Sequence, residues 1–387
     1  MGPVRGIKKR RKQDKNGSAS ASASGSSEKE GHEDWWEELS KRINGLPKSP
    51  PKISRKTFEY ICSLVKDDMM TKASHFVFTN GKPMSLFDQV AVALRRLGSG
   101  DSLVTIGDSF GLNHSTVSQV TWRFVESMEE KGLHHLQWPS TQDEMNSIKS
   151  KFEKIKGFPN CCGAVDVTHI TISLPASEHS SNVWLDHKNN HSMVLQAIVD
   201  PDMKFRDIVT GWPGKMEDSV IFKNSNFNKL CDKGERLNGK KLKLSEGSEI
   251  REYIVGDSGY PLLPYLVVPY EEKELSNSET KAKFNRLHLT TRMVAQRALT
   301  RLKEMWRIIH GIMWRPDKHR LPRIILVCCL LHNIVIDMQD EVVDELLCLY
   351  HNNHDSGYHQ LICQGVDDKG VALREKLSHY LNGRLDS

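Results

Sequence analysis

Hydrophobic positions between Ile53 and Pro139 recur every three or four residues, which is the spacing of amphipathic helices. One series starts at Phe58 and another at Leu86. Two further helices are predicted on either side of the turn Gly111-Leu112-Asn113, the second beginning at His114-Ser115-Thr116. Two helices joined by a glycine-containing turn indicate a helix-turn-helix unit.

The second helix of this unit would turn polar residues away from its apolar face. Thr116, Gln119 and Arg123 share that face and could reach a DNA groove. Since Arg123 is the only basic residue among them, its attraction to phosphate would be weak. An ordinary helical core without any role in DNA binding stays open as the alternative.

From Phe158 onward the pattern changes to the alternation that is typical of β-strands. The turn Asp200-Pro201-Asp202 would join two of these strands as a hairpin. Strands that are followed by long helices indicate one mixed α/β domain. The predicted strands are 164–172, 193–199, 205–209 and 253–255, and the predicted helices are 290–309 and 322–338.

These patterns divide the chain into four parts. Residues 1–52 hold a basic head, a Ser/Ala-rich linker and an acidic segment with Trp35-Trp36. A helical domain with the helix-turn-helix segment is expected at 53–150, and the α/β domain at 155–345. Residues 346–387 are expected to form a polar, partly helical tail.

Charge and cysteine content indicate the compartment. The net charge of +5 depends on the head, where Lys8, Lys9, Arg10, Arg11 and Lys12 form a cluster typical of nuclear import. The longest apolar stretch, 324–336, is too short to cross a membrane, and no signal peptide precedes the head. Sparse cysteines without a Cys-x-x-Cys pair favour buried thiols in a reducing compartment. We therefore expect a nuclear protein that does not contact membranes.

Three aspartates are candidates for chemistry. Asp166 lies inside a predicted strand and Asp257 directly follows another, although an unpaired carboxylate inside a sheet is costly. Asp218 could join them, or it could cap the helix that begins at Ser219. Carboxylates that converge from strand ends hold Mg²⁺ or Mn²⁺, and such ions support phosphodiester cleavage. Capping of a tight turn is the alternative for Asp257.

Residues 281–323 carry twelve basic and two acidic residues, interleaved with Trp306 and Trp314. A basic surface beside a carboxylate cluster suits a polyanionic substrate. A solvated helix face is the alternative, although such faces usually mix both signs of charge.

These motifs together resemble those of PIF/Harbinger-type transposases. More closely, they are similar to domesticated plant proteins of the antagonist-of-like-heterochromatin-protein type and to the Harbinger-derived nucleases of animals. The resemblance spans about 80–340 and is carried by Gly163 to Ile170, Gly211-Trp212-Pro213-Gly214, Asp218-Ser219, Gly256 to Pro261, Asn285 with Arg292, and Leu331-His332-Asn333. His332-Asn333 lies on an apolar helix, so we expect a packed, hydrogen-bonded pair there.

The resemblance implies an RNase H-like domain with an Asp-Asp-Glu triad and a divalent metal. Asp166 and Asp257 occupy the first two positions, and Asp218 matches a further aspartate of the family. The third position falls on Gln296, in a register fixed by Arg297, Leu302 and Lys303. Glutamine lacks the negative charge and offers a donor where a cation needs an acceptor. The substitution therefore predicts that cleavage has been lost.

Three hypotheses follow from the triad and the basic segment. The leading one is a domesticated, non-cleaving nuclear protein that regulates chromatin or transcription. The resemblance implies a Myb/SANT-like DNA-binding partner and a chromatin-modifying or Polycomb-related complex, with direct DNA contact as a further possibility. The others are an active metal-dependent DNA endonuclease and an adaptor without nucleic-acid contact. Expected DNA-binding residues in the basic segment are Arg292, Arg297, Arg301, Lys303 and Arg307.

Overall fold

The computed structural model describes residues 30–44, 53–71, 76–174, 182–245, 247–276, 278–314, 320–340 and 362–383. The chain divides into two units between Glu38 and Leu39, and the second contains all the elements described below except the start of α1 (Glu30–Asn44). The predicted import cluster Lys8–Lys12 lies outside the described residues.

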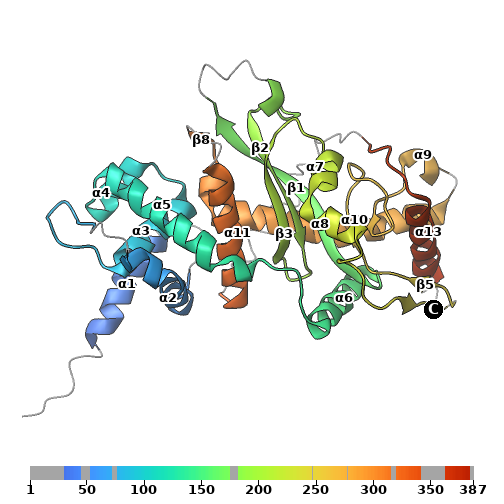
Figure 1. Ribbon diagram of the computed structural model, residues 1–387, viewed down its shortest axis with the longest axis horizontal. Helices are drawn as coiled ribbons and strands as arrows, with labels where there is room; N and C mark the ends of the chain where they lie inside the picture. The colour runs from blue at the N-terminus through green and yellow to red at the C-terminus, as the bar shows by residue number, and fades with distance from the viewer. Residues whose placement is uncertain are drawn as a thin grey trace, which may run out of the picture. The chain divides into compact units, whose positions relative to one another are not determined.

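The expected helices of the first part are present (Figure 1). Their apolar faces meet in one core, where Phe58, Leu94 and Phe124 are almost fully buried. Between the third and fourth of them Gly111 adopts a left-handed φ of 66°, which lets the chain turn directly after one helix and begin the next. The elements are α2 (Arg55–Thr71), α3 (Leu86–Ser99), α4 (Leu103–Phe110) and α5 (His114–Lys131), followed by the short η1 (Leu133–His135).

A mixed sheet forms the second part, with the strand order β3-β2-β1-β6-β7. The first three strands are antiparallel, whereas β6 and β7 run parallel to β1. This arrangement fits an RNase H-like domain and agrees with the mixed α/β prediction. The strands are β1 (Cys161–Ser173), β2 (Ser192–Val199), β3 (Phe205–Pro213), β6 (Tyr253–Val255) and β7 (Leu266–Val267); β8 (Met313–Trp314) pairs with the far end of β1, and β4 (Leu242–Lys243) pairs with β5 (Glu249–Ile250).

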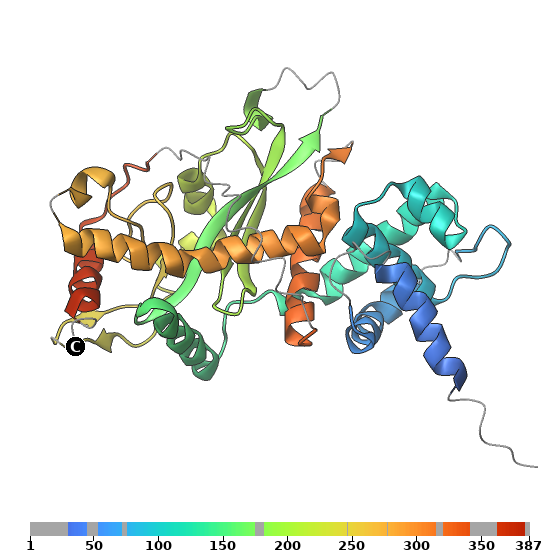
Figure 2. The same cartoon turned by 180° about the vertical axis from the view of Figure 1, so that it is seen from behind.

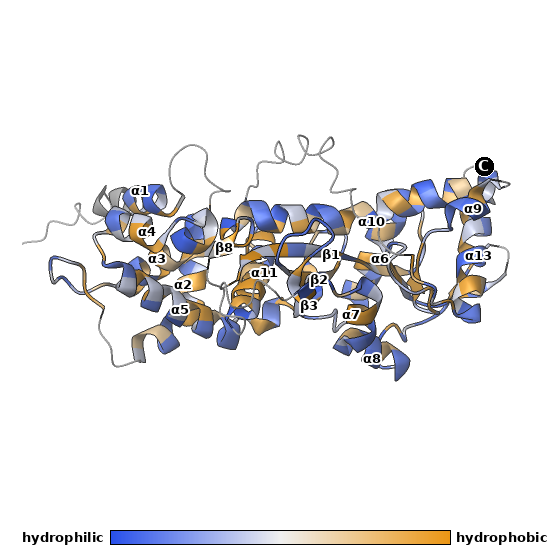
Figure 3. Cartoon of the chain, turned by 90° about the horizontal axis from the view of Figure 1, so that it is seen from above, coloured by the Kyte–Doolittle hydropathy of each residue, from blue (hydrophilic) through white to orange (hydrophobic). Residues whose placement is uncertain are grey.

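Two long helices pack against this sheet. Figure 2 shows α10 (Glu279–Met305) crossing the sheet, and it begins earlier in the chain than the predicted Thr290. The second, α11 (Leu321–Asp337), is apolar along most of its length (Figure 3) and packs on both α5 and β3, with its residues 327–335 buried. The helical part and the sheet therefore share packed contacts through α11.

Shorter helices complete the unit. Thr141 caps α6 (Gln142–Lys156), which packs on β1, and α7 (Asp218–Asn224) and α8 (Asn226–Asp232) follow β3. The predicted tail contains α13 (Asp368–Gly383), which packs on α10 and β7 and buries Leu377. Minor elements are α9 (Glu272–Leu275), η3 (Asn182–Trp184) and η4 (Arg307–Ile309). Among the described helices, none combines the length and the apolar character that a membrane span requires.

Candidate carboxylate site and basic surface

The sheet brings the first two predicted aspartates together. Asp166 lies inside β1, paired with Ala197 of β2, and Asp257 follows the end of the neighbouring strand β6. Between that strand and Asp257 stands Gly256, where a Cβ atom would lie 2.9 Å from Val165 Cγ1. Glycine therefore permits the close approach that sets the two carboxylates side by side.

A guanidinium group from α10 joins these two carboxylates. Arg292 Nη1 donates to Asp166 Oδ2 at 2.8 Å and to Asp257 Oδ2 at 3.4 Å. The three side chains are only 13 %, 7 % and 12 % exposed, respectively. The two aspartates raise the pKa of Arg292 even though burial opposes this. Arg292, predicted as a DNA-binding residue, is thus held inside the carboxylate site.

Backbone amides hold the remaining oxygen of each carboxylate. Val167 N donates to Asp166 Oδ1 at 2.8 Å, and Gly259 N donates to Asp257 Oδ1 at 3.0 Å. Each aspartate therefore has one oxygen fixed by its own strand or turn and the other directed at Arg292. The Asp257 bond closes the tight turn that the sequence offered as the alternative role for this residue.

Asp218 and Tyr260 complete the surroundings. Asp218 is the first residue of α7, whose N-cap is Glu217, so Asp218 does not cap the helix. Burial raises the pKa of Asp218 well above its ordinary value, and the charges of Asp257 and Asp166 raise it further. The buried Tyr260 hydroxyl has no hydrogen-bond partner among the described residues, and the same carboxylates help to raise its pKa. Sequence reasoning missed Tyr260, although it belongs to the Gly256–Pro261 motif.

The third predicted position, Gln296, lies one turn after Arg292 on α10. Helical geometry places it about 40° around the axis from Arg292 and about 6 Å further along. Its side chain is exposed, whereas Asp166 and Asp257 are buried. The structure therefore puts an uncharged, solvent-exposed amide at the position where the family's glutamate is expected.

The predicted basic residues do not share one surface. At 100° per residue, Arg297 and Arg301 lie about 140° and 180° around α10 from Arg292. Arg297 and Arg307 are exposed and form no ion pair with any described residue, whereas Arg301 is half-buried. Lys303 donates to the carbonyl oxygen of His169 at 2.9 Å. Among the described basic residues of 281–323, Arg286, Arg297 and Arg307 are exposed without an ion pair to any described residue, and Arg320 is exposed with its guanidinium over the Trp122 ring.

In the segment predicted to be a helix-turn-helix, Gln119 is exposed and Thr116 is half-buried. Arg123 is only 8 % exposed, and its guanidinium lies 4.2 Å from the centre of the Phe76 ring. Arg123 therefore packs into the helical core, which corrects the expectation that it faces outward with Gln119. Without Arg123, this helix face offers no cation to DNA phosphate.

The residues present do not fit a bound divalent metal. Arg292 Nη1 lies within hydrogen-bonding distance of both carboxylates, at the place that a shared cation would take. Throughout the part of the chain that the structure describes, no three His, Cys, Asp or Glu residues are arranged to hold an ion. The cation that the carboxylate pair has in this structure is therefore a side chain of the same protein.

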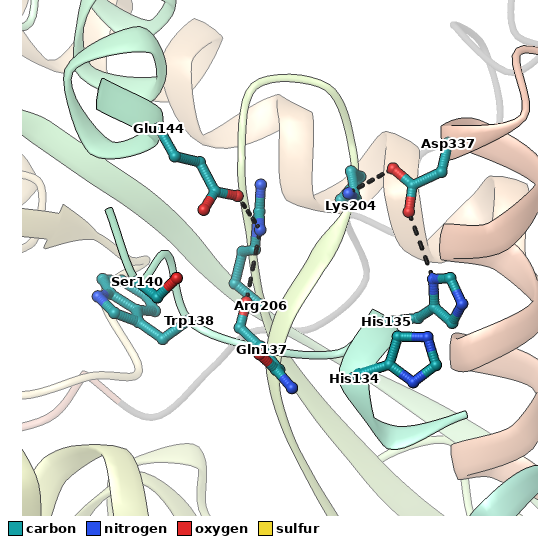
Figure 4. Close-up of a pocket in the computed structure, with 9 residues that line it drawn as sticks. All are labelled: His134, His135, Gln137, Trp138, Ser140, Glu144, Lys204, Arg206 and Asp337. Atoms are coloured by element: carbon teal, nitrogen blue, oxygen red, sulfur yellow. Dashed lines mark hydrogen bonds and ion pairs between the residues drawn. The ribbon is translucent and has the colours of Figure 1, made fainter. Parts of the chain in front are cut away.

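A separate polar pocket of about 140 Å³ lies where η1, β3 and α11 meet (Figure 4). Its charged groups are paired with one another: Lys204 with Asp337 at 2.5 Å and Arg206 with Glu144 at 2.7 Å. His135 lies 3.5 Å from Asp337, and its other ring nitrogen is 2.8 Å from the Tyr60 hydroxyl. These pairs connect the helical part to the sheet, so we interpret the pocket as structural.

Comparison with known proteins agrees with this geometry. The profile of the DDE superfamily endonuclease family matches residues 165–333, which contain the three aspartates and Arg292. An Arabidopsis thaliana ALP1-like protein is 57 % identical over 360 residues, covering 92 % of this chain and 87 % of its own. The chain belongs to the Harbinger-transposase-derived ALP1-like family.

Two further relatives define how far this similarity reaches. The Arabidopsis protein named Antagonist of Like Heterochromatin Protein 1 is 46 % identical over 359 residues, covering 90 % of this chain and 89 % of its own. Human HARBI1 is 24 % identical over 253 residues, covering 64 % of this chain and 67 % of its own. No solved structure matches the chain.

Proposed function

We propose that this chain is a nuclear, chromatin-associated regulator that keeps the endonuclease fold without cutting DNA. The observation that carries the proposal is the state of the carboxylate site: Arg292 bridges Asp166 and Asp257, and the third acidic position is the exposed Gln296. Metal-assisted cleavage needs carboxylate oxygens that are free to hold cations, and this site has one acid fewer than the triad.

Similarity across nearly the whole chain supports the chromatin role. A relative that shares 46 % identity over 90 % of this chain is named as an antagonist of a heterochromatin protein. The helical part and the sheet are both included in that match, so the resemblance is not confined to the endonuclease domain. Nuclear location is proposed on the cluster Lys8–Lys12.

Partners and DNA contact form the second half of the proposal. By resemblance, the chain acts with a Myb/SANT-like DNA-binding protein inside a chromatin-modifying or Polycomb-related complex. Arg286, Arg297 and Arg307 supply an exposed basic surface that can add a weak, sequence-independent contact to phosphate. Because Arg123 is buried, we assign sequence recognition to the partner and not to α5.

An active endonuclease is the second candidate, because Asp166, Asp218 and Asp257 influence one another electrostatically and lie in one region. The purified full-length chain, incubated at high concentration with plasmid DNA and Mg²⁺ or Mn²⁺, separates the two candidates. The proposal expects no nicking above that of Asp166→Ala. Metal-dependent nicking that Asp166→Ala abolishes would establish the endonuclease.

The chromatin role is tested in nuclei. A tagged wild-type chain should co-purify with a Myb/SANT-like protein and chromatin-modifying subunits, and Asp166→Asn should co-purify with the same set. Substitution of Lys8–Lys12 by alanine should leave the protein outside the nucleus. Recovery of the wild-type chain without chromatin proteins would instead support an adaptor with other partners.

A further inference from the structure

The cation between Asp166 and Asp257 is fixed to the fold, because it belongs to α10. We propose that Arg292 is the resident counter-ion of these carboxylates, that it takes the place of a metal ion and that it fastens α10 to the sheet. The inference rests on the proposed function, since a site that has stopped cutting is free to keep a permanent cation. Beyond the proposed function, the ion pairs of Arg292 with Asp166 and Asp257 hold α10 on the sheet without a metal ion.

The geometry of the contact carries this assignment. A single nitrogen atom, Nη1, reaches Oδ2 of both aspartates, at 2.8 Å and 3.4 Å. The two Oδ1 atoms accept from the backbone amides of Val167 and Gly259. An entering metal ion would therefore have to displace the guanidinium and also compete with two backbone hydrogen bonds.

Burial makes the displacement costly. The Arg292 side chain is 13 % exposed, and a guanidinium group keeps its charge at every accessible pH. Removal of one partner from a buried ion pair leaves the others uncompensated. For a metal ion to bind, Arg292 would have to move into solvent and leave Asp166 and Asp257 without their counter-ion. A loosely bound ion from solution therefore competes poorly with the Arg292 guanidinium.

The connection also spans the fold. Asp166 lies in the central strand β1, Asp257 follows its parallel neighbour β6, and Arg292 lies in the helix that crosses the sheet. The three residues come from segments far apart in the sequence. Through this one guanidinium the two acids hold α10 on the sheet.

Metal binding and melting of the full-length chain test the inference without reference to cleavage. Mn²⁺ alone is the probe, followed by electron paramagnetic resonance and by thermal melting with Mn²⁺ or EDTA. Wild-type protein should show no saturable Mn²⁺ binding that depends on Asp166, and its melting temperature should be the same in both solutions.

Arg292→Gln should melt about 5 °C lower in EDTA, because it leaves two buried carboxylates without a counter-ion. It should also gain saturable Mn²⁺ binding that the wild type lacks, and Mn²⁺ should recover most of the lost melting temperature. Asp166→Asn in the Arg292→Gln background should remove the gained binding. Arg297→Gln, on the same helix but exposed, is the matched control and should have the melting temperature and the Mn²⁺ response of the wild type.

Saturable, Asp166-dependent Mn²⁺ binding by the wild type would overturn the inference, as would an Arg292→Gln protein that gains no Mn²⁺ binding. If Arg292→Gln does not fold, Arg292→Lys, which keeps one positive charge at the site, is measured instead. It should melt at a lower temperature than wild type and show no saturable Mn²⁺ binding, and saturable, Asp166-dependent Mn²⁺ binding by Arg292→Lys would overturn the inference. Failure of the chromatin experiments would contradict the proposed function and leave the metal result standing.

Discussion

The side-chain amide of Asn333 pairs with both backbone groups of Phe205. Its Oδ1 accepts from Phe205 N at 2.9 Å, and its Nδ2 donates to Phe205 O at 2.8 Å and to His135 O at 2.8 Å. The side chain thus satisfies the outer edge of β3 as a neighbouring strand would. The predicted role of His332-Asn333 as a packed, hydrogen-bonded pair is confirmed.

Asn333→Leu should therefore lower the free energy of unfolding by about 2–4 kcal/mol, because it removes the side-chain partner of two buried backbone groups of Phe205 and of the partly buried His135 carbonyl. Urea unfolding followed by circular dichroism measures the change. Asn224→Leu, an exposed residue in α7, should shift the free energy by less than about 0.5 kcal/mol. Equal effects of the two substitutions would contradict the role of Asn333.

His332 should make the fold sensitive to acid. Burial lowers its pKa to about 3, and its Nε2 donates to the Met203 carbonyl at 3.0 Å. Because the folded pKa lies below the ordinary 6.5, the stabilisation is complete above about pH 6.5 and is lost as the pH falls toward 3. Between pH 7.5 and 5.5 the loss should be about 1 kcal/mol.

His332→Gln should remove that part of the pH dependence, which unfolding curves at the two pH values would reveal. His134→Gln is the control, because His134 is exposed in the pocket of Figure 4. A slope that stays the same in His332→Gln would assign the acid sensitivity to other groups.

Asp207 should favour the folded state at low pH, which is opposite to the effect of His332. Burial raises its pKa to about 7, while Arg236 partly offsets the shift. A carboxyl whose folded pKa lies above its unfolded value favours folding at low pH, and this contribution is lost as the pH rises from about 4 through 7. Asp207→Asn should therefore be more stable than wild type at pH 8, by up to about 4 kcal/mol, because the pKa lies about three units above its ordinary value. Asp108→Asn, exposed on α4, should show no such gain.

The close approach of β6 and β1 predicts a further stability effect. Gly256→Ala would place its Cβ 2.9 Å from Val165 Cγ1 and 3.0 Å from the Tyr260 ring, so the neighbouring groups must move. We expect a loss of about 1–3 kcal/mol, measured by thermal or urea unfolding. Gly311→Ala meets no atom within 4 Å and should be neutral. A neutral Gly256→Ala would show that the strand end can move freely.

Sequence patterns located most of the fold because burial and periodicity coincide there. The helix 322–338 was predicted nearly in full, since it has one continuous apolar pattern. The hairpin at Asp200-Pro201-Asp202 was predicted at the right place, but its second strand continues beyond the predicted 205–209 to Pro213. By contrast, α6 and α13 were missed or left indefinite, because each buries only a few residues among many charges. Short helices such as α7 carry too few turns for any periodicity to be seen.

The candidate site was predicted in part for a similar reason. Aspartates in apolar strands stand out, so Asp166 and Asp257 were found, whereas Arg292 was grouped with the other basic residues of its segment. Which side of a helix an arginine takes depends on what packs against that helix, and this information lies in residues far away in the sequence. The same limit applies to Arg123, whose Phe76 contact could not be foreseen.

Asp340, which follows α11, joins the endonuclease region to the helical part of the chain. Asp340 accepts from Ser54 N at 3.1 Å and from Thr57 Oγ1 at 2.8 Å, so the end of α11 holds the start of α2. Helix α6 precedes residues 165–333 and α13 follows them, and both helices pack on elements of that region. A fragment cut at those limits would divide β1 within its own length and lose α6 and α13 from the elements on which they pack, so the limits of the family match are not a place where this protein can be divided.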